Sequence, residues 1–146
     1  MLKKLLVIGL MAASAHTIGF AANHEIKMLD NGTDGSIVFE PGFVKAEVGD
    51  TVTFIPTNKG HWTQSRVVPE GAEKFLSEED KEFTVKLTNE GVYVYVCPPH
   101  RMMNMSGIIQ VGKATNKEQA EKMVVELEKR ANDNKGRLAK YFEQVK

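Results

Sequence analysis

Short segments rich in β-branched and aromatic residues, separated by turn-forming sequences, run through residues 25–111. Sequences such as DNGTDG, EPG, VGD and TNEG favour turns, because glycine, asparagine, aspartate and proline suit the backbone angles that turns require. The segments that we expect to be strands are Glu25–Leu29, Ser36–Phe39, Phe43–Val48, Thr51–Ile55, Glu82–Leu87, Val92–Val96 and Gly107–Val111. Short strands at this spacing predict a mainly β fold, a β-sandwich with Greek-key connections.

The segment Val92–Val96 is apolar on both of its faces. Alternation along a strand places Tyr93, Tyr95 and Cys97 on one face and the valines on the other. A strand with two apolar faces is stable only when both are removed from water. We therefore expect both faces of this strand to be covered.

The hydrophobic period changes after Lys113, where Thr115 followed by Glu118 has the pattern of a capping box. One helical stripe comprises Ala120, Met123, Val124, Leu127 and Ala131. After ANDNKG, a second and shorter stripe comprises Leu138, Tyr141, Phe142 and Val145. We expect two amphipathic helices in residues 114–146, packed on the sandwich of residues 22–113 in the same domain, where they could cover the valine face of Val92–Val96.

The N-terminus has the pattern of a signal peptide over residues 1–21. Lys3 and Lys4 precede an apolar run that is too short to span a bilayer, and small residues follow it. We expect cleavage near Ala21 or Ala22, although ASA at residues 13–15 is a competing site, and export to the periplasm. The alternative is that this segment is a buried N-terminal helix.

Formal net charge is +0 for the whole chain, with 19 basic and 19 acidic side chains. Removal of Lys3 and Lys4 with a signal peptide leaves 17 basic and 19 acidic side chains, a net charge of −2. Neither balance favours nucleic acid as a partner. The single cysteine, Cys97, cannot form an internal disulfide in an oxidising compartment, so it needs a chemical role or a buried position.

The sequence VCPPHRMMNMSG at residues 96–107 places Cys97, His100 and Met105 in the pattern C-x2-H-x4-M. A thiolate, an imidazole and a thioether together suit copper held as both Cu(I) and Cu(II). Such a site needs a second imidazole, and His61 in NKGHW follows a predicted strand. His24 is a poorer candidate, because we expect the N-terminal segment that contains it to be frayed.

These residues lie in sequences that resemble the pseudoazurins, small blue-copper proteins of the cupredoxin superfamily. The resemblance rests on GDTVTFIPTNKGHW, VPEGAEKF and GVYVYVCPPHRMMNMSGIIQVG, and extends to MLDNGTDGSIVFEPGFVKAEVGD. It implies a cupredoxin sandwich with two C-terminal helices, and a periplasmic electron carrier with one type 1 copper ion rather than an enzyme. It also implies His61, Cys97 and His100 as close ligands and Met105 as a weak axial ligand.

The resemblance further implies transient redox partners and a monomeric carrier. The acceptor would be nitrite reductase or another periplasmic reductase of denitrification, and the donor would be a cytochrome c. It implies that the electron leaves through His100, whose exposed edge would lie in an apolar patch. The matching positions in this chain are Met28, Ile37, Pro56, Pro99 and Met103. The alternative is that these are ordinary core or surface residues.

Lysines around such a patch commonly dock acidic partners in this family. Lys59 and Lys74 are present here, and Arg101 is an additional cation beside His100. Asn31 and Val96 stand where lysine is frequent. We therefore expect electrostatic docking that is weaker or differently placed, whereas the alternative for each cation is an ordinary solvated charge.

Two departures from the family pattern lie beside the expected ligands. Trp62 stands where asparagine is usual and Pro98 where threonine is usual, and in the family these two side chains hydrogen-bond across the ligand loops. Our hypothesis is that Trp62 packs on Pro98, with a partly exposed surface tryptophan as the alternative. The backbone N–H of Trp62 can still bond the Cys97 sulfur, whereas Pro98 and Pro99 have no N–H. Fewer hydrogen bonds to the sulfur predict a higher reduction potential.

Two other functional classes remain open from the sequence. A copper storage or delivery module would favour exchangeable cysteine and methionine sites, unlike the closed set expected here. A copper-free structural or thiol-reactive protein would leave Cys97 free to titrate. Zinc accepts the same strong ligands, but the axial thioether suits it poorly.

Overall fold

The computed structural model describes residues 19–146, so the signal sequence expected at residues 1–21 lies outside the described residues except for its last three. The strands are β1 (Asn23–Gly32), β2 (Gly35–Glu40), β3 (Phe43–Ala46), β4 (Thr51–Pro56), β5 (Gln64–Val67), β6 (Phe83–Lys86), β7 (Gly91–Val96) and β8 (Ser106–Val111). The helices are the 3₁₀ helix η1 (Pro98–Met103) and the α-helices α1 (Lys117–Arg130) and α2 (Arg137–Phe142).

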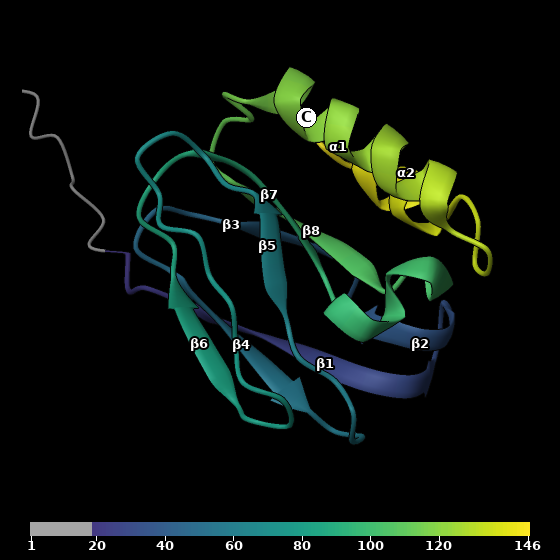
Figure 1. The fold of residues 1–146 in the computed structure, drawn as a ribbon. Helices are drawn as coiled ribbons and strands as arrows, with labels where there is room; N and C mark the ends of the chain where they lie inside the picture. The colour runs from purple at the N-terminus through teal and green to yellow at the C-terminus, as the bar shows by residue number, and fades with distance from the viewer. Residues whose placement is uncertain (1–18) are drawn as a thin grey trace, which may run out of the picture.

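Two four-stranded sheets face each other, with the orders β2-β1-β4-β6 and β3-β8-β7-β5 (Figure 1). The pairs β1–β4 and β3–β8 are parallel, and the other neighbouring strands are antiparallel. The core between the sheets includes Ile26, Met28, Phe39, Phe54, Tyr93, Tyr95, Cys97 and Ile109. This arrangement confirms the predicted β-sandwich and the predicted inward face of Tyr93, Tyr95 and Cys97.

Every segment predicted as a strand forms one, with ends that differ by a few residues. The sequence prediction missed β5, whose residues QSRV are mostly polar. Burial nevertheless alternates along β5, since Ser65 and Val67 are buried while Gln64 and Arg66 are partly exposed. Ser65 tolerates burial because its Oγ accepts the N–H of Phe75 at 2.9 Å.

Helices α1 and α2 cover the outer face of the sheet that contains β7 and β8 (Figure 1). A second apolar cluster joins them to the sheet, and it includes Val92, Val94, Val96, Ile108, Ala120, Val124, Leu127, Leu138, Tyr141 and Val145. The prediction that helices cover the valine face of β7 is therefore confirmed. None of the helices between residues 19 and 146 has the length and apolar character that a membrane span requires.

The predicted capping box at Thr115 and Glu118 is wrong. The N-cap of α1 is Asn116, and the Thr115 hydroxyl instead donates to the Glu90 carbonyl at 3.0 Å. The Asn116 side chain also binds the start of β7. Its Oδ1 accepts the Val92 N–H at 2.6 Å, and its Nδ2 donates to the Val92 carbonyl at 3.0 Å. These polar side chains join the helix to the sheet rather than capping the helix.

Gly107 faces Tyr95 in the register of β7 and β8. A Cβ atom at Gly107 would lie 2.3 Å from the Tyr95 hydroxyl oxygen, so that no larger residue fits without displacing the ring. The loop that joins these two strands begins at Cys97, whose N–H donates to the Met105 carbonyl at 2.9 Å. Close packing of Tyr95 on Gly107 therefore supports the base of this loop.

Candidate metal centre

Residues 97–105 form a short loop that is closed by its own backbone. The Cys97 carbonyl accepts the His100 N–H at 3.1 Å, and the His100 carbonyl accepts the Met105 N–H at 3.2 Å. Asn104 ends the 3₁₀ turn in a left-handed conformation, with φ of 55°. Prolines at the start of η1 suit this turn, because the first N–H groups of a helix have no partner within it.

The loop brings Cys97 and His100 next to His61, which lies between β4 and β5. The Cys97 Sγ atom is 3.4 Å from Nδ1 of His100 and 3.9 Å from Nδ1 of His61. The potential ligand atoms of these three residues all lie within 4.8 Å of one another, and this is the only such His, Cys, Asp or Glu group between residues 19 and 146. His61 and Cys97 are fully buried, His100 is partly exposed, and Met105 is fully buried in the same loop.

Burial shapes the protonation of these groups. It raises the pKa of the Cys97 thiol to about 11, although the backbone N–H groups of Trp62 and His100 oppose this effect. Burial also lowers the pKa of His100, and repulsion from His61 adds to this while the Asp30 carboxylate opposes it. The centre therefore offers a thiol that a metal must deprotonate and an imidazole that favours the neutral, ligating form.

His61 has a second partner that the sequence analysis missed. Its Nε2 atom lies 2.9 Å from Oδ1 of Asp30, at the end of β1. A carboxylate acceptor at Nε2 favours the tautomer in which Nδ1 carries the lone pair, and Nδ1 is the atom that faces Cys97. No local pattern in the sequence links these two residues, because they are 31 positions apart.

Comparison with known proteins identifies the type of centre. A family model described as copper binding proteins of the plastocyanin/azurin family matches residues 26–112. Pseudoazurin of Paracoccus pantotrophus is 46% identical over 98 residues, which span 66% of this chain and 68% of that protein. A putative pseudoazurin of Rhizobium leguminosarum bv. viciae is 45% identical over 114 residues, which span 73% and 75%. The chain belongs to the plastocyanin/azurin family, among the pseudoazurins.

The pseudoazurin fold extends through the helices. The crystal structure of native pseudoazurin from Hyphomicrobium denitrificans aligns with a TM-score of 0.75 at 37% identity, over 85% of this chain and 98% of that one. As a pseudoazurin the chain has one copper ion as its cofactor, and it is an electron carrier rather than an enzyme. The donor set agrees with this cofactor, because thiolate, thioether and imidazole ligands together suit copper.

Side chains of the C-terminal helices of this pseudoazurin form hydrogen bonds with the loop of residues 97–105. Asn104 is 2% exposed, and its Nδ2 donates to Glu128 Oε1 at 3.0 Å and to the Asn134 carbonyl at 2.9 Å. The Arg137 guanidinium, which is also buried, donates to the carbonyl oxygens of Asp34, Ser36, Ile37, Met103 and Asn104. Sequence periodicity found the apolar stripe of α2 but not this inward-facing arginine.

The residues that depart from the pseudoazurin pattern lie close to the centre. Trp62 and Pro98 are partly exposed and Pro99 is exposed. The backbone N–H of Trp62 interacts with the Cys97 sulfur, as expected from the sequence. Packing of the Trp62 ring on Pro98 stays a prediction.

Two expectations about individual residues are wrong. Met28 cannot belong to an exposed patch, because it is 0% exposed and packs in the core. Strand alternation explains this, since Met28 shares the inward face of β1 with Ile26. His24 is not frayed, because it pairs with Val52 across β1 and β4 and its Nε2 lies 2.9 Å from Asp50 Oδ2.

The other patch residues are accessible to different degrees. Ile37, Pro56 and Met103 are partly exposed, and Met102, which the sequence analysis did not single out, is 59% exposed. The cations Lys59, Lys74 and Arg101 are all exposed. Docking roles for these residues stay predictions.

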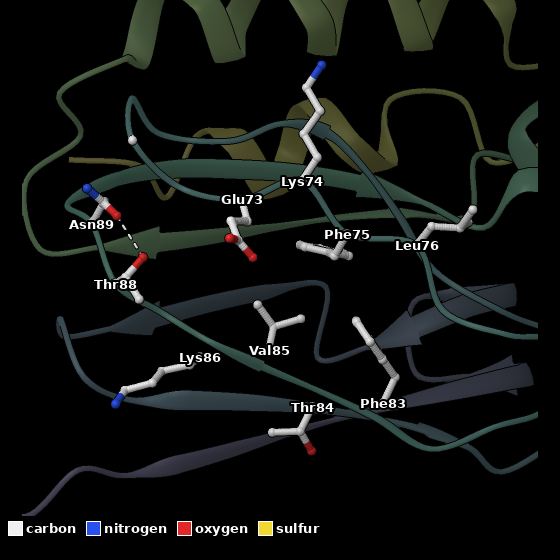
Figure 2. A pocket seen from close by; sticks show the side chains of 11 residues that line it. Glu73, Lys74, Phe75, Leu76, Phe83, Thr84, Val85, Lys86, Thr88 and Asn89 are labelled. Atoms are coloured by element: carbon white, nitrogen blue, oxygen red, sulfur yellow. Dashed lines mark hydrogen bonds between the residues drawn. The ribbon is translucent and has the colours of Figure 1, made fainter.

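A hollow of about 630 Å³ lies between the 71–76 segment and β6 (Figure 2). Lys74, Phe75 and Phe83 are among its lining residues, and none of the four expected copper ligands contributes to it. The centre is therefore built in packed protein rather than in this hollow, as suits a carrier that has no substrate to admit.

Proposed function

We propose that this pseudoazurin carries single electrons in the periplasm, from a cytochrome c donor to a reductase such as the nitrite reductase of denitrification. The observation that carries the proposal is the convergence of one buried thiol and two imidazoles within 4.8 Å, beside a buried thioether. We assign His61, Cys97 and His100 as the residues that would hold the copper ion most strongly, and the Met105 thioether as a weaker donor. This donor set serves both oxidation states of copper.

A bound copper ion supplies the one-electron couple, and the protein supplies a rigid and dry site for it. His61 and Met105 are held away from water, and the backbone bonds of residues 97–105 fix the spacing of Cys97 and His100. Rigid ligands suit electron transfer, because little has to move when the charge of the site changes. All four positions supply ligands from the protein, which leaves no place for a substrate.

His100 is the proposed path for the electron, since it is the one imidazole of the centre that is partly exposed. Ile37, Pro56, Pro99 and Met103 are the proposed apolar surface around its edge. Arg101, Lys59 and Lys74 are the proposed cations for an acidic partner, of which Arg101 lies in the same 3₁₀ helix as His100. Small and partly charged surfaces suit short-lived redox encounters.

Export and a monomeric state belong to the same proposal. Lys3, Lys4 and the apolar run after them support a signal peptide over residues 1–21. Denitrifying reductases and their small carriers would then share one compartment. A monomer leaves the surface around His100 free for successive partners.

The test begins with residues 22–146, to which Cu(II) is added while the visible spectrum is recorded. We expect an intense thiolate-to-copper band that disappears with ascorbate and returns with ferricyanide. The copper-loaded protein is then mixed with a nitrite reductase in a stopped-flow experiment, where fast oxidation of the carrier is expected. A colourless protein with a titratable thiol, or rapid copper exchange without electron transfer, would contradict the proposal.

A further inference from the structure

The Asp50 carboxylate lies at the start of β4 and holds the N-terminal segment. Its Oδ1 accepts the Ala22 N–H at 2.8 Å, and its Oδ2 accepts the Glu47 N–H at 3.0 Å. Nε2 of His24 also lies 2.9 Å from Oδ2. Asp50 is only 7% exposed, so these three groups converge on a largely buried carboxylate.

Regular pairing of the described chain starts at Ala22. The Ala22 carbonyl accepts the Thr51 N–H at 2.9 Å, and Asn23 Oδ1 accepts the hydroxyls of Thr51 and Thr53 at 2.7 and 2.9 Å. Phe20, two residues earlier, is 96% exposed. Within residues 19–146, the boundary between unpaired and paired residues therefore lies next to the bond between residues 21 and 22.

The sequence before this bond fits the requirements of a signal peptidase, which accepts small side chains one and three residues before the cleaved bond. Cleavage after Ala21 places Ala21 and Gly19 at these positions. Cleavage after Ala22 would place Phe20 at the position three residues before the bond. The bond after Ala21 is therefore the better substrate of the two.

We propose that a signal peptidase hydrolyses the Ala21–Ala22 bond and that the new α-ammonium group of Ala22 forms an ion pair with Asp50. Water supplies the oxygen of the Ala21 carboxylate and the protons that complete the Ala22 ammonium. The nitrogen that donates to Asp50 as an amide in the full chain then donates to it as a cation. This inference rests on the export that is part of the proposed function.

The ion pair should bind the N-terminus more strongly than the neutral hydrogen bond that it replaces. A charge-assisted hydrogen bond is roughly twice as strong as a neutral one, and Asp50 is held largely away from competing water. It would fasten Ala22, the residue before β1, to Asp50, the residue before the neighbouring strand β4. Processing thus converts a neutral hydrogen bond of the uncleaved chain into an ion pair, and the strand that follows Ala22 carries Asp30 near its other end.

The first test is to express the full chain in a Gram-negative host and to determine the intact mass and N-terminal sequence of the periplasmic protein. We expect Ala22 as the first residue. Periplasmic protein that begins at Asn23 or His16 would overturn this inference alone. Uncleaved protein confined to the cytoplasm would overturn the proposed export as well, so the two failures are distinguishable.

The second test measures how fast an amine-selective acylating reagent modifies the α-amine of the exported protein at pH 8. The Asp50→Asn variant should react about fivefold faster, because lowering the pKa of the α-amine by about one unit raises its free-amine fraction at pH 8 by roughly this factor. Asp133→Asn serves as a matched control, since Asp133 is exposed in the turn before α2. Equal rates for the exported protein and Asp50→Asn would overturn the ion pair, even if cleavage occurs after Ala21.

Discussion

The Nε2 atom of His61 lies 2.9 Å from Oδ1 of Asp30, so a carboxylate holds the imidazole of the proposed copper ligand from behind. The imidazole is buried, whereas the Asp30 side chain is 53% exposed. The hydrogen bond orients His61, and the negative charge stabilises positive charge on the far side of the ring. The Asp30 carboxylate should therefore lower the reduction potential, whereas the absence of N–H donors at Pro98 and Pro99 should raise it.

Replacement of Asp30 by asparagine should raise the reduction potential of the copper-loaded protein. The amide keeps an acceptor for His61 but removes the charge that favours Cu(II). Because Asp30 is half exposed, we expect an increase on the order of tens of millivolts, where about 59 mV corresponds to a tenfold change for a one-electron couple. A redox titration measures it, with Asp133→Asn as the control. Equal shifts in the two variants would show that Asp30 does not tune the centre.

The Pro98→Thr variant should have a lower reduction potential than the native protein. Threonine restores a backbone N–H and a hydroxyl beside Cys97, and donors near a thiolate stabilise Cu(II). Redox titration of this variant, of Trp62→Asn and of the double variant would reveal whether the two positions act together. A higher potential in Pro98→Thr would refute the assigned direction.

Replacement of Trp62 by alanine tests the proposed apolar contact with Pro98. If the indole packs on the proline, its loss should weaken copper binding and shift the potential, because the two ligand loops lose a contact. Competition with a copper chelator and redox titration measure these two effects. Unchanged values would mean that Trp62 is an ordinary surface aromatic residue.

Long-range contacts mark the limit of what the sequence could predict. Alternation of apolar residues was enough to place Tyr93, Tyr95 and Cys97 on the inward face of β7. The same alternation would have placed Met28 in the core, but analogy with family positions assigned it to the surface. No local sequence pattern predicts the roles of Asp30 and Arg137. The partner of Asp30 is the His61 imidazole, 31 positions away. The partners of Arg137 are backbone carbonyl groups, such as that of Ile37, 100 positions away.

Arg137→Met should destabilise the protein by roughly 3 kcal/mol, because several buried carbonyl groups lose their donor at once. Urea unfolding measures this loss. The visible spectrum of the copper-loaded variant reports whether residues 97–105 also shift. Arg130→Met is the matched control, because Arg130 forms an exposed pair with Glu126 that contributes little. Equal stability losses in the two variants would contradict the role of Arg137 as the anchor of the loop.

The Arg101→Glu variant should slow electron transfer to an acidic partner far more at low salt than at high salt. Arg101 is exposed beside His100, and salt screens the attraction between exposed charges. Stopped-flow rates with a reductase at two ionic strengths measure the effect. The control is Lys86→Glu, because the exposed Lys86 pairs with Thr51 at the end of β4 that is opposite to His61. A loss that is independent of salt would argue against electrostatic docking at this position.

Asp50 should make the free energy of unfolding depend on pH in the acidic range. N–H donation from Glu47, the hydrogen bond with His24 and N–H donation from Ala22 lower the pKa of this carboxyl to about 2. Because the unfolded chain has the higher pKa, of about 3.9, the unfolded state binds more protons between these values. The contribution of Asp50 is therefore fully present above about pH 5 and is lost as the pH falls through about 2.

Asp50→Asn isolates this contribution, because every other carboxylate titrates alike in the two proteins. The free energy of unfolding should be lower in the variant at pH 6, and the difference from the native protein should shrink steadily as the pH falls from about 4 towards 2. Denaturant unfolding at several pH values measures the difference, and Asp133→Asn should show almost none. A difference that stays constant down to pH 2 would mean that Asp50 stabilises β1 through geometry that does not depend on its charge.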